Sequence, residues 1–200
     1  MRTFILRAQK ANTTSFDIDD LPGAGRIDLV CRCISNAVFL SNDMRRDTII
    51  HVVLEGPKNP PKIISFNGNE LRDFYFDERN IARLILIALK KGKTLNLNET
   101  INVHPGINIS KKSFEQLIKE QTGKLFYLHK KGTAIENVKF EENTTFIFGD
   151  YTGVPKNTEK FLDRYAERVK LSNKMLFASH CIIIVNNELD KSFNNTQIII

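Results

Sequence analysis

Short β-branched and aromatic runs alternate with amphipathic segments along the chain, and this alternation is the strongest constraint on its fold. Apolar side chains recur at steps of three and four in residues 27–40, which predicts an amphipathic helix. Strands that alternate with helices predict an α/β fold with a mainly parallel sheet and helices on both faces. The expected strands are residues 3–6, 48–54, 63–66, 124–128, 144–148 and 169–171, and the other expected helices are residues 81–88, 113–121 and 157–168.

Residues 1–200 contain no repeat, low-complexity tract or sharp change of composition, so we expect a single domain. The polar stretch 94–110 contains short extended pieces, and residues 94–108 receive no assigned role. Residues 181–185 (CIIIV) are ambiguous, because their β-branched side chains favour a strand although the surrounding apolar residues also fall at helical spacing. The pattern alone favours a strand there. The tail, NNTQIII, is compatible with a terminal strand, a dimer contact or disorder.

The net charge of +6 and the isoelectric point near 9.2 indicate either a polyanionic partner such as RNA or simply a lysine-rich soluble protein. Cys31, Cys33 and Cys181 lack the spacing of a zinc site, and no histidine–carboxylate cluster accompanies them, so we expect no metal. They are typical of buried thiols in a reducing compartment. No apolar run reaches the length of a membrane span, and Arg7 interrupts the short apolar start, so we expect a cytoplasmic protein without a membrane partner.

Two segments near the C-terminus indicate a ligand pocket: TTFIFGDYTGVP (residues 144–155) and LSNKMLFASHCIIIVNNELD (residues 171–190). A strand that ends in a glycine turn leaves backbone N–H and C=O groups free at its carboxyl end. Ligands bind at that end in open α/β sheets, so the two segments predict one pocket built mostly from backbone. The glycine loops match neither a P-loop nor GxGxxG, and the chain has no GxSxG elbow.

Two charged motifs lie in the N-terminal half. DLPGAGRID places Arg26 at a helix start between Asp20 and Asp28, and SNDMRRD places two arginines before Asp47 at a helix end. Each motif alone is compatible with a loop, a helix cap or a solvated helix terminus. The functional alternative is phosphate binding, because arginine presents a planar fork of hydrogen-bond donors.

Taken together, DLPGAGRIDLVCRCISNAVFLSNDMRRDT, FIFGDYTGVP and LSNKMLFASHCIIIVNNELD resemble the archaeal tRNA pseudouridine N1-methyltransferases, the TrmY family of the SPOUT superfamily. The resemblance covers nearly the whole chain. It implies a SPOUT fold whose C-terminal segment forms a trefoil knot, S-adenosylmethionine as methyl donor, and a homodimer. It also implies that residues 181–185 belong to a C-terminal helix at the dimer interface, against the strand that the pattern favours.

The resemblance further implies a reaction, methylation of N1 of pseudouridine 54 in the T loop of tRNA. The cofactor loops would contain Leu128, Gly149 and residues of the 171–181 stretch, namely Leu171, Ser172, Leu176 and Cys181. A carboxylate would serve as general base or orienting group, with Asp20 the first choice and Asp28 and Asp47 the alternatives. Arg26, Arg45 and Arg46 would hold RNA phosphates around a base turned out of its stack.

Cys181 would line the donor pocket rather than act as a nucleophile, because N1 needs only deprotonation to attack the methyl group. Two alternatives remain. One is an N1-methyltransferase of pseudouridine in ribosomal RNA, a SPOUT relative with similar cofactor loops. The other is a non-catalytic RNA-binding protein of the same fold.

Overall fold

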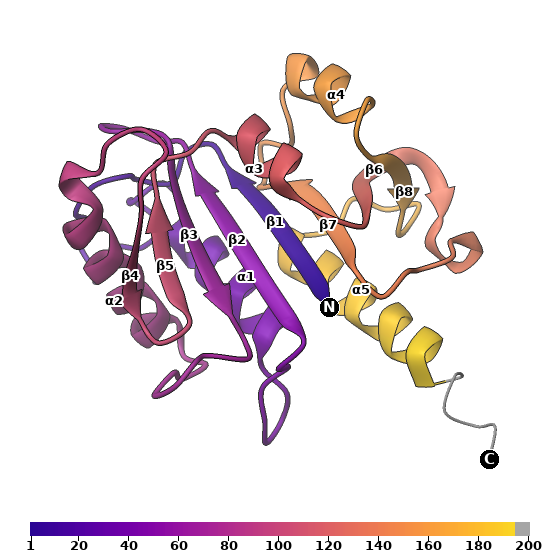
Figure 1. Ribbon diagram of the computed structural model, residues 1–200, viewed down its shortest axis with the longest axis horizontal. Coiled ribbons are helices and arrows are strands. Elements are labelled where there is room, and N and C mark those ends of the chain that lie inside the picture. Colours follow the sequence, from indigo (N-terminus) through magenta and orange to yellow (C-terminus); the bar gives the residue numbers. More distant parts are fainter. Residues whose placement is uncertain (195–200) are drawn as a thin grey trace.

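The computed structural model describes residues 1–194; most of the C-terminal tail, residues 195–200, lies outside the described part. One eight-stranded sheet runs through the molecule in the order β4–β5–β3–β2–β1–β7–β6–β8 (Figure 1). The strands are β1 (Arg2–Ala8), β2 (Thr48–Leu54), β3 (Lys62–Asn67), β4 (Thr100–His104), β5 (Ile107–Ser110), β6 (Lys124–Ala134), β7 (Thr144–Gly149) and β8 (Glu167–Lys170). The helices are α1 (Ile27–Val38), α2 (Glu78–Lys91), α3 (Phe114–Glu120), α4 (Lys156–Leu162) and α5 (Ala178–Asn194).

The sheet is mainly parallel, as the alternation of strands and helices predicts. β2, β1, β7, β6 and β8 pair with one another in parallel. The other end of the sheet is antiparallel, because β3 pairs with β2 and the hairpin of β4 and β5 continues the sheet from β3. This hairpin accounts for the polar stretch 94–110, whose two short strands are joined at Gly106, with a φ of 74°.

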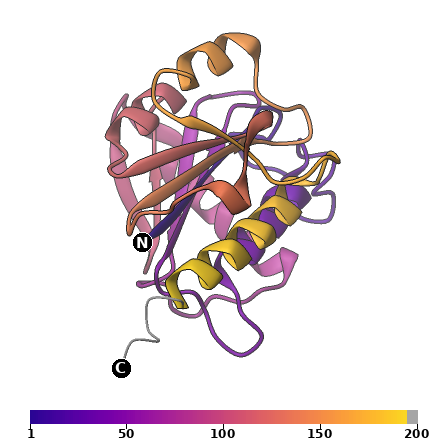
Figure 2. The same cartoon turned by 90° about the vertical axis from the view of Figure 1, so that its right-hand side faces the viewer.

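Helices cover both faces of the sheet, and alternate strand residues divide between them. Phe4 and Leu6 of β1 join the larger core beneath α1, α2 and α5, whereas Ile5 joins a smaller core beneath α3 and α4. Figure 2 shows α5 beside α1, and the side-chain amide of Asn36 in α1 donates a hydrogen bond to the carbonyl oxygen of Ser179 in α5 at 3.1 Å. The short helices α3 and α4 therefore cover less of the sheet than the three longer ones.

The strand favoured for residues 181–185 is wrong, because they form the first turns of α5. Ile182, Val185 and Leu189 are fully buried at helical spacing, and their packing in the larger core outweighs β propensity. The helix implied by the resemblance is confirmed. The helix expected for residues 157–168 is too long, since α4 ends at Leu162 and Glu167 already belongs to β8.

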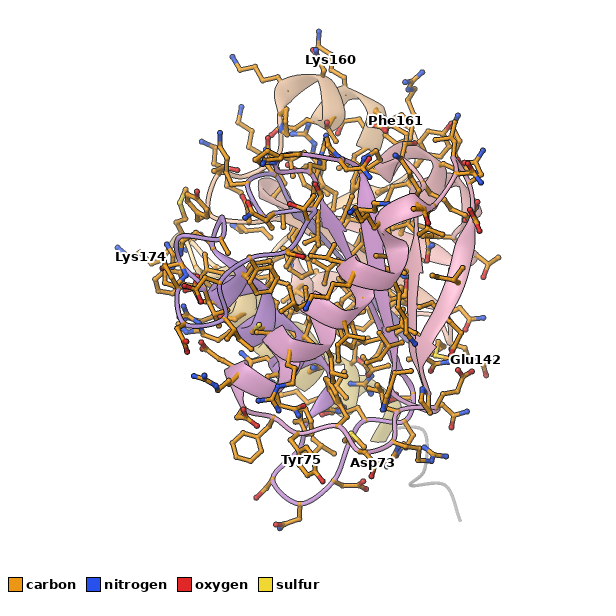
Figure 3. The ribbon with its side chains drawn as sticks, turned by 90° about the vertical axis from the view of Figure 1, so that its left-hand side faces the viewer. Asp73, Tyr75, Glu142, Lys160, Phe161 and Lys174 are labelled. Carbon is orange, nitrogen blue, oxygen red and sulfur yellow. The ribbon has the colours of Figure 1, made fainter. Side chains whose placement is uncertain are left out.

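The parallel strands give the molecule two distinct ends. Their carboxyl ends lead into α4 and the turn after Gly149, whereas their amino ends adjoin Glu142 and the loop after β3. Figure 3 shows Lys160 and Phe161 of α4 at one end, and Glu142 and Asp73 at the other. A seven-residue strand such as β1 separates the two ends by roughly 20 Å.

His51 in β2 makes stability pH-dependent. Its Nδ1 lies 2.7 Å from the hydroxyl of Ser65, and burial lowers the pKa of the imidazole to about 4. Between about pH 6.5 and 4 the unfolded chain therefore binds a proton that the folded chain does not, which lowers the free energy of unfolding. We expect a loss of about 2–3 kcal/mol between about pH 7 and pH 4.5, measured by urea unfolding.

Burial and the charge of Arg168 also lower the pKa of His129. Its protonation in the unfolded chain therefore adds to the loss of unfolding free energy on acidification. A His51→Gln variant isolates the contribution of His51, because the amide can still bond Ser65 but does not titrate. The loss on acidification should be clearly smaller in this variant. An equal loss in both proteins would mean that another group controls stability in this range.

In residues 1–194, none of the helices combines the length and the hydropathy that crossing a membrane requires.

Candidate functional site

A tight turn follows β7, where Asp150 and Gly153 form an isolated antiparallel bridge. Asp150 Oδ1 accepts hydrogen bonds from the backbone N–H of Thr152 at 2.8 Å and from its hydroxyl at 2.6 Å. A Cβ atom at Gly149 would lie 2.3 Å from the carbonyl oxygen of Gly153, so the turn can close only with glycine at this position. The sequence GDYTG therefore fixes the backbone in one shape at the carboxyl end of a central strand.

The end of β1 binds this turn through Gln9. The backbone N–H of Gln9 donates to Asp150 Oδ2 at 2.9 Å, and its side-chain amide donates to the hydroxyl of Thr152 at 2.8 Å and to the carbonyl oxygen of Gly153 at 2.9 Å. The backbone N–H of Asp150 donates to the carbonyl oxygen of Arg7 at 3.0 Å. The two neighbouring strands thus end in one hydrogen-bonded unit.

The loop before α1 reaches the same unit through Arg26. This residue has a φ of 68°, in the left-handed region, and its guanidinium donates two hydrogen bonds of 3.0 Å to the carboxylate of Asp28. The guanidinium carbon also lies 5.5 Å from the ring centre of Tyr151, a cation–π distance. A left-handed arginine held on both sides is an unusual local conformation that the surrounding contacts must maintain.

Asp28 is buried and bonded to two arginines, Arg26 and Arg32. Burial by itself would raise the pKa of the carboxyl, but the hydrogen bonds from the two arginines outweigh it and lower the pKa. A carboxylate in this state is a weak proton acceptor, so the geometry favours a positioning role for Asp28.

Asp20, in contrast, is exposed and bonded only within its own loop. Its Oδ1 accepts a hydrogen bond from the backbone N–H of Gly23 at 2.9 Å, and its backbone carbonyl accepts from Ala24. Because this loop also carries Arg26, Asp20 lies in the segment that contacts the turn after β7. It is the one of the three candidate carboxylates with no ion pair among the described residues.

The segment between β8 and α5 forms the other side of the candidate pocket. Leu128 at the register shift of β6 and Leu171 after β8 pack half-buried against the larger core. In the described structure, the backbone of residues 172–176 makes no hydrogen bond to other backbone groups. The backbone N–H of Lys174 donates to the hydroxyl of Ser172 at 3.0 Å, and the other donors and acceptors of this stretch are available to a ligand. A cavity of about 160 Å³ adjoins this segment, lined by Ala134, Glu136, Lys170, Leu171, Ser172 and Asn173. Leu176 is half-buried just before α5.

Cys181 lies in the first turn of α5, where its backbone N–H bonds the carbonyl oxygen of Phe177. Burial raises the pKa of its thiol to about 11, so the sulfur is protonated and weakly nucleophilic near neutral pH. Burial, the neighbouring Cys181 and the charge of Asp150 raise the pKa of Cys33 in α1. The start of α5, the middle of α1 and the turn after β7 therefore converge around these thiols.

Arg45, Arg46 and Asp47 lie at the amino end of the strands, away from this pocket in the same chain. Arg45 forms an ion pair with Asp190 of α5 at 2.6 Å, and Arg46 donates to backbone carbonyls after β3. Asp47 pairs at 2.9 Å with Arg2, which also bonds Asp190. The structure thus brings together Arg26, Asp20, Asp28 and Gly149, whereas Arg45 binds the C-terminal half of α5 directly and Asp47 is linked to it through Arg2.

Gln9 and Tyr151 are site residues that sequence reasoning missed. Gln9 follows β1 directly, and Tyr151 lies inside GDYTG and is 54% exposed. An aromatic residue inside a glycine turn was the available signal for Tyr151. Nothing in the sequence pairs Gln9 with a turn more than a hundred residues away. In residues 1–194 no group of three or more His, Cys, Asp and Glu side chains could hold a metal ion.

Comparisons with known proteins identify the family to which the chain belongs. The model of the SAM-dependent RNA methyltransferase family matches residues 1–193. The tRNA (pseudouridine(54)-N(1))-methyltransferase of Methanocaldococcus jannaschii is 46% identical over 200 residues, covering 96% of this chain and 97% of the relative. The enzyme of the same name from Thermococcus gammatolerans is 39% identical over 196 residues, covering 95% of this chain and 97% of that relative.

Among solved structures, Archaeoglobus fulgidus Nep1 bound to S-adenosylhomocysteine resembles this fold with a TM-score of 0.66. The identity is 13%, and the alignment covers 96% of this chain and 98% of that one, so the likeness concerns the fold alone. It confirms the SPOUT fold that the resemblance implied; the trefoil knot stays a prediction. With the matches of the family model and of the full-length relatives, the chain belongs to the family of SAM-dependent RNA methyltransferases that includes the archaeal tRNA (pseudouridine(54)-N(1))-methyltransferases.

Proposed function

We propose that this enzyme transfers a methyl group from S-adenosylmethionine to N1 of pseudouridine 54 in the T loop of tRNA. The contact of Arg26 with Tyr151 carries the proposal, because it joins the loop that contains Asp20 to the turn after β7. A methyl donor bound at the turn and a target nucleotide bound at the loop would then lie next to each other. The names of the relatives from Methanocaldococcus jannaschii and Thermococcus gammatolerans specify this substrate position.

The residues at the carboxyl end fit an adenosyl donor. Leu128, Leu171 and Leu176 supply half-buried apolar side chains for a flat base, and Gly149 lets the turn after β7 close against Gly153. Apart from the N–H of Lys174, which is bonded to the hydroxyl of Ser172, the backbone groups of residues 172–176 can supply hydrogen bonds. S-adenosylmethionine brings its own activated methyl group, so the protein contributes binding, orientation and charge placement.

Asp20 is the proposed general base for the N1 proton, with Arg26 holding the RNA next to it. Asp28 fixes Arg26 through two hydrogen bonds and so acts on the substrate through the arginine. Cys181 lines the donor pocket, and its protonated thiol fits no covalent step. Phosphate binding by Arg45 and Arg46, and any catalytic role of Asp47, require a second subunit that places them near this pocket.

The donor-binding role of Gly149 makes a sharp prediction. In a Gly149→Ala variant the new Cβ would meet two backbone atoms of Gly153 at 2.3 and 2.5 Å, so the turn must open. The strain of about 1–3 kcal/mol should weaken binding of S-adenosylmethionine about 10- to 100-fold, measured by calorimetry. Gly153→Asn is the matched control, because its position has open space and a φ of 76°, which asparagine tolerates. Equal affinities in all three proteins would exclude this turn from the donor site.

We propose that the enzyme is a cytoplasmic homodimer of single-domain chains, residues 1–200, each with a trefoil knot at its C-terminal end. Apolar side chains exposed around the start of α5 support the dimer: Phe177 is 62% exposed and Ile183 is 52% exposed. We expect light scattering to give twice the mass of the chain, and Ile183→Glu to shift the mass toward the monomer. A monomeric parent protein, or an unchanged dimer of the variant, would remove this face from the interface.

Methyl transfer from labelled S-adenosylmethionine to two T-loop stem-loops, with uridine or pseudouridine at position 54, tests the proposed reaction. Label on the pseudouridine RNA alone is the expected result. Label on neither RNA, with donor binding intact, would favour a pseudouridine of ribosomal RNA as the substrate. Failure to bind the donor at all would favour a non-catalytic RNA-binding protein.

A further inference from the structure

Lysines gather on the loops at the carboxyl end of the sheet, beyond the residues used in the proposed reaction. Four of them form what is called here the lysine track: Lys10, Lys58, Lys93 and Lys111. Lys10 follows β1, Lys58 lies between β2 and β3, Lys93 follows α2 and Lys111 follows β5. The first three are exposed and Lys111 is partly buried.

Backbone contacts place the loops of the lysine track side by side. A Cβ atom at Gly25, next to Arg26, would lie 1.8 Å from the carbonyl oxygen of Lys10, so the track begins at the candidate site. Gly56 touches the same carbonyl, since its own Cβ would lie 2.4 Å from it. The backbone N–H of Gly56 donates to the carbonyl oxygen of Ala11 at 2.9 Å. The loops that carry Lys10 and Lys58 are therefore packed together.

Asn59 joins the other half of the lysine track. Its side-chain amide donates to the carbonyl oxygen of Lys93 at 3.4 Å, and its side-chain oxygen accepts from Lys111 Nζ at 2.6 Å. Its backbone N–H donates to the hydroxyl of Thr13 at 2.9 Å, which connects this region back to the loop after β1. The track thus runs without a break from Arg26 to the loop at the start of the β4–β5 hairpin.

Of the acidic side chains near the lysine track, two form ion pairs with residues outside it and one, Glu99, forms no ion pair in the described structure. Glu55 pairs with Arg7 at 2.7 Å, and Glu120 pairs with Lys112 at 2.8 Å. Glu99 accepts hydrogen bonds from Asn96. Buried Lys62 lies beneath the track with Nζ bonded to the carbonyl oxygen of Gly92, and burial and the charge of Lys111 lower its pKa. The four ammonium groups of the track outnumber the carboxylate of Glu99, so the local field is positive, and it faces solvent where Lys58 and Lys93 are exposed.

We propose that the lysine track binds the sugar–phosphate backbone of the tRNA outside the T-loop stem-loop, while the candidate site holds the target nucleotide. This rests on the proposed function. Exposed lysines that begin beside Arg26 and lead away from it suit a repeating phosphate chain, because each ammonium group replaces condensed counterions. A compact anion would need converging donors, which these separate loops do not provide.

A Lys58→Gln/Lys93→Gln variant tests the lysine track, because neither ammonium group forms an ion pair or hydrogen bond in the described structure. We expect the variant to bind a full tRNA transcript about tenfold more weakly near physiological salt. The slope of log affinity against log salt should become shallower by about two, one unit for each lost phosphate contact. Binding of the isolated T-loop stem-loop and methyl transfer to it should stay at the parental level.

Lys119→Gln/Lys139→Gln is the matched control, since it removes two exposed charges at the amino end of the strands. It should keep the parental affinity and salt slope. Equal affinities of the two variants for full tRNA would overturn the proposal, and so would an equal loss on the full tRNA and the stem-loop. Absence of methyl transfer by the parent protein would contradict the proposed function instead, and the binding comparison would still decide whether the track contacts RNA.

Discussion

An Asp20→Asn enzyme is expected to transfer methyl groups about 10²- to 10⁴-fold more slowly than the parent, the range typical of a lost general base. The substitution removes the charge and keeps the loop, because an asparagine oxygen can still accept the 2.9 Å hydrogen bond from the backbone N–H of Gly23. Single-turnover methylation of the pseudouridine stem-loop measures the effect. Donor affinity should not change, since Asp20 is outside the proposed donor loops.

The pH dependence distinguishes a lost base from a damaged loop. The rate of the variant should rise with pH as the N1 proton of the substrate dissociates unaided, and it should approach the parental rate in alkaline solution. Asp19→Asn is the matched control, because Asp19 is an exposed neighbour whose surface ion pair with Arg79 is weak. A parental rate in the Asp20→Asn enzyme would move the proposed base to Asp47 of a second subunit.

The local structure around the pocket was predicted correctly where a single local pattern, such as apolar spacing or a pair of glycines, determines the backbone conformation. Apolar spacing predicted a helix over residues 27–40, of which Ile27–Val38 form α1, and the glycines of GDYTG indicated the turn after β7 correctly. Propensity failed at residues 181–185, because contacts with α1, distant in sequence, decide the structure of α5. The antiparallel hairpin of β4 and β5 was missed because its alternation is short and mostly polar.

The individual motifs of the candidate site could be identified in the sequence, but which of them lie together in space could not. The loop with Arg26 and the turn with Tyr151 are more than a hundred residues apart, and parallel strands bring them to one end of the sheet. Arg45 and Asp47 have the same residue types as Arg26 and Asp28, yet they lie at the amino ends of the strands. Helix α1 separates the two motifs and runs from one end of the sheet to the other, which spacing in sequence does not reveal.

Arg26 should be nearly as sensitive as Asp20, for a different reason. Its guanidinium is fixed by Asp28 at 3.0 Å and by the ring of Tyr151 at 5.5 Å before any substrate arrives. A hydrogen-bond donor that is already fixed in the free enzyme loses little conformational freedom when the substrate binds, so more of its interaction energy stabilises the transition state. We expect Arg26→Gly to lower the rate of methyl transfer about 10²- to 10³-fold, the cost of removing one preorganised donor.

The choice of substituent separates the guanidinium from the backbone. Glycine adopts the φ of 68° without strain, so Arg26→Gly should unfold at a denaturant concentration close to the parental one. Arg26→Lys keeps the charge but lacks the planar fork that meets both oxygens of Asp28, so it should restore only a small part of the rate. Tyr151→Phe keeps the ring beneath the guanidinium and should stay close to the parental rate. Parental rates in Arg26→Gly would show that the fixed arginine serves only to fold the loop before α1.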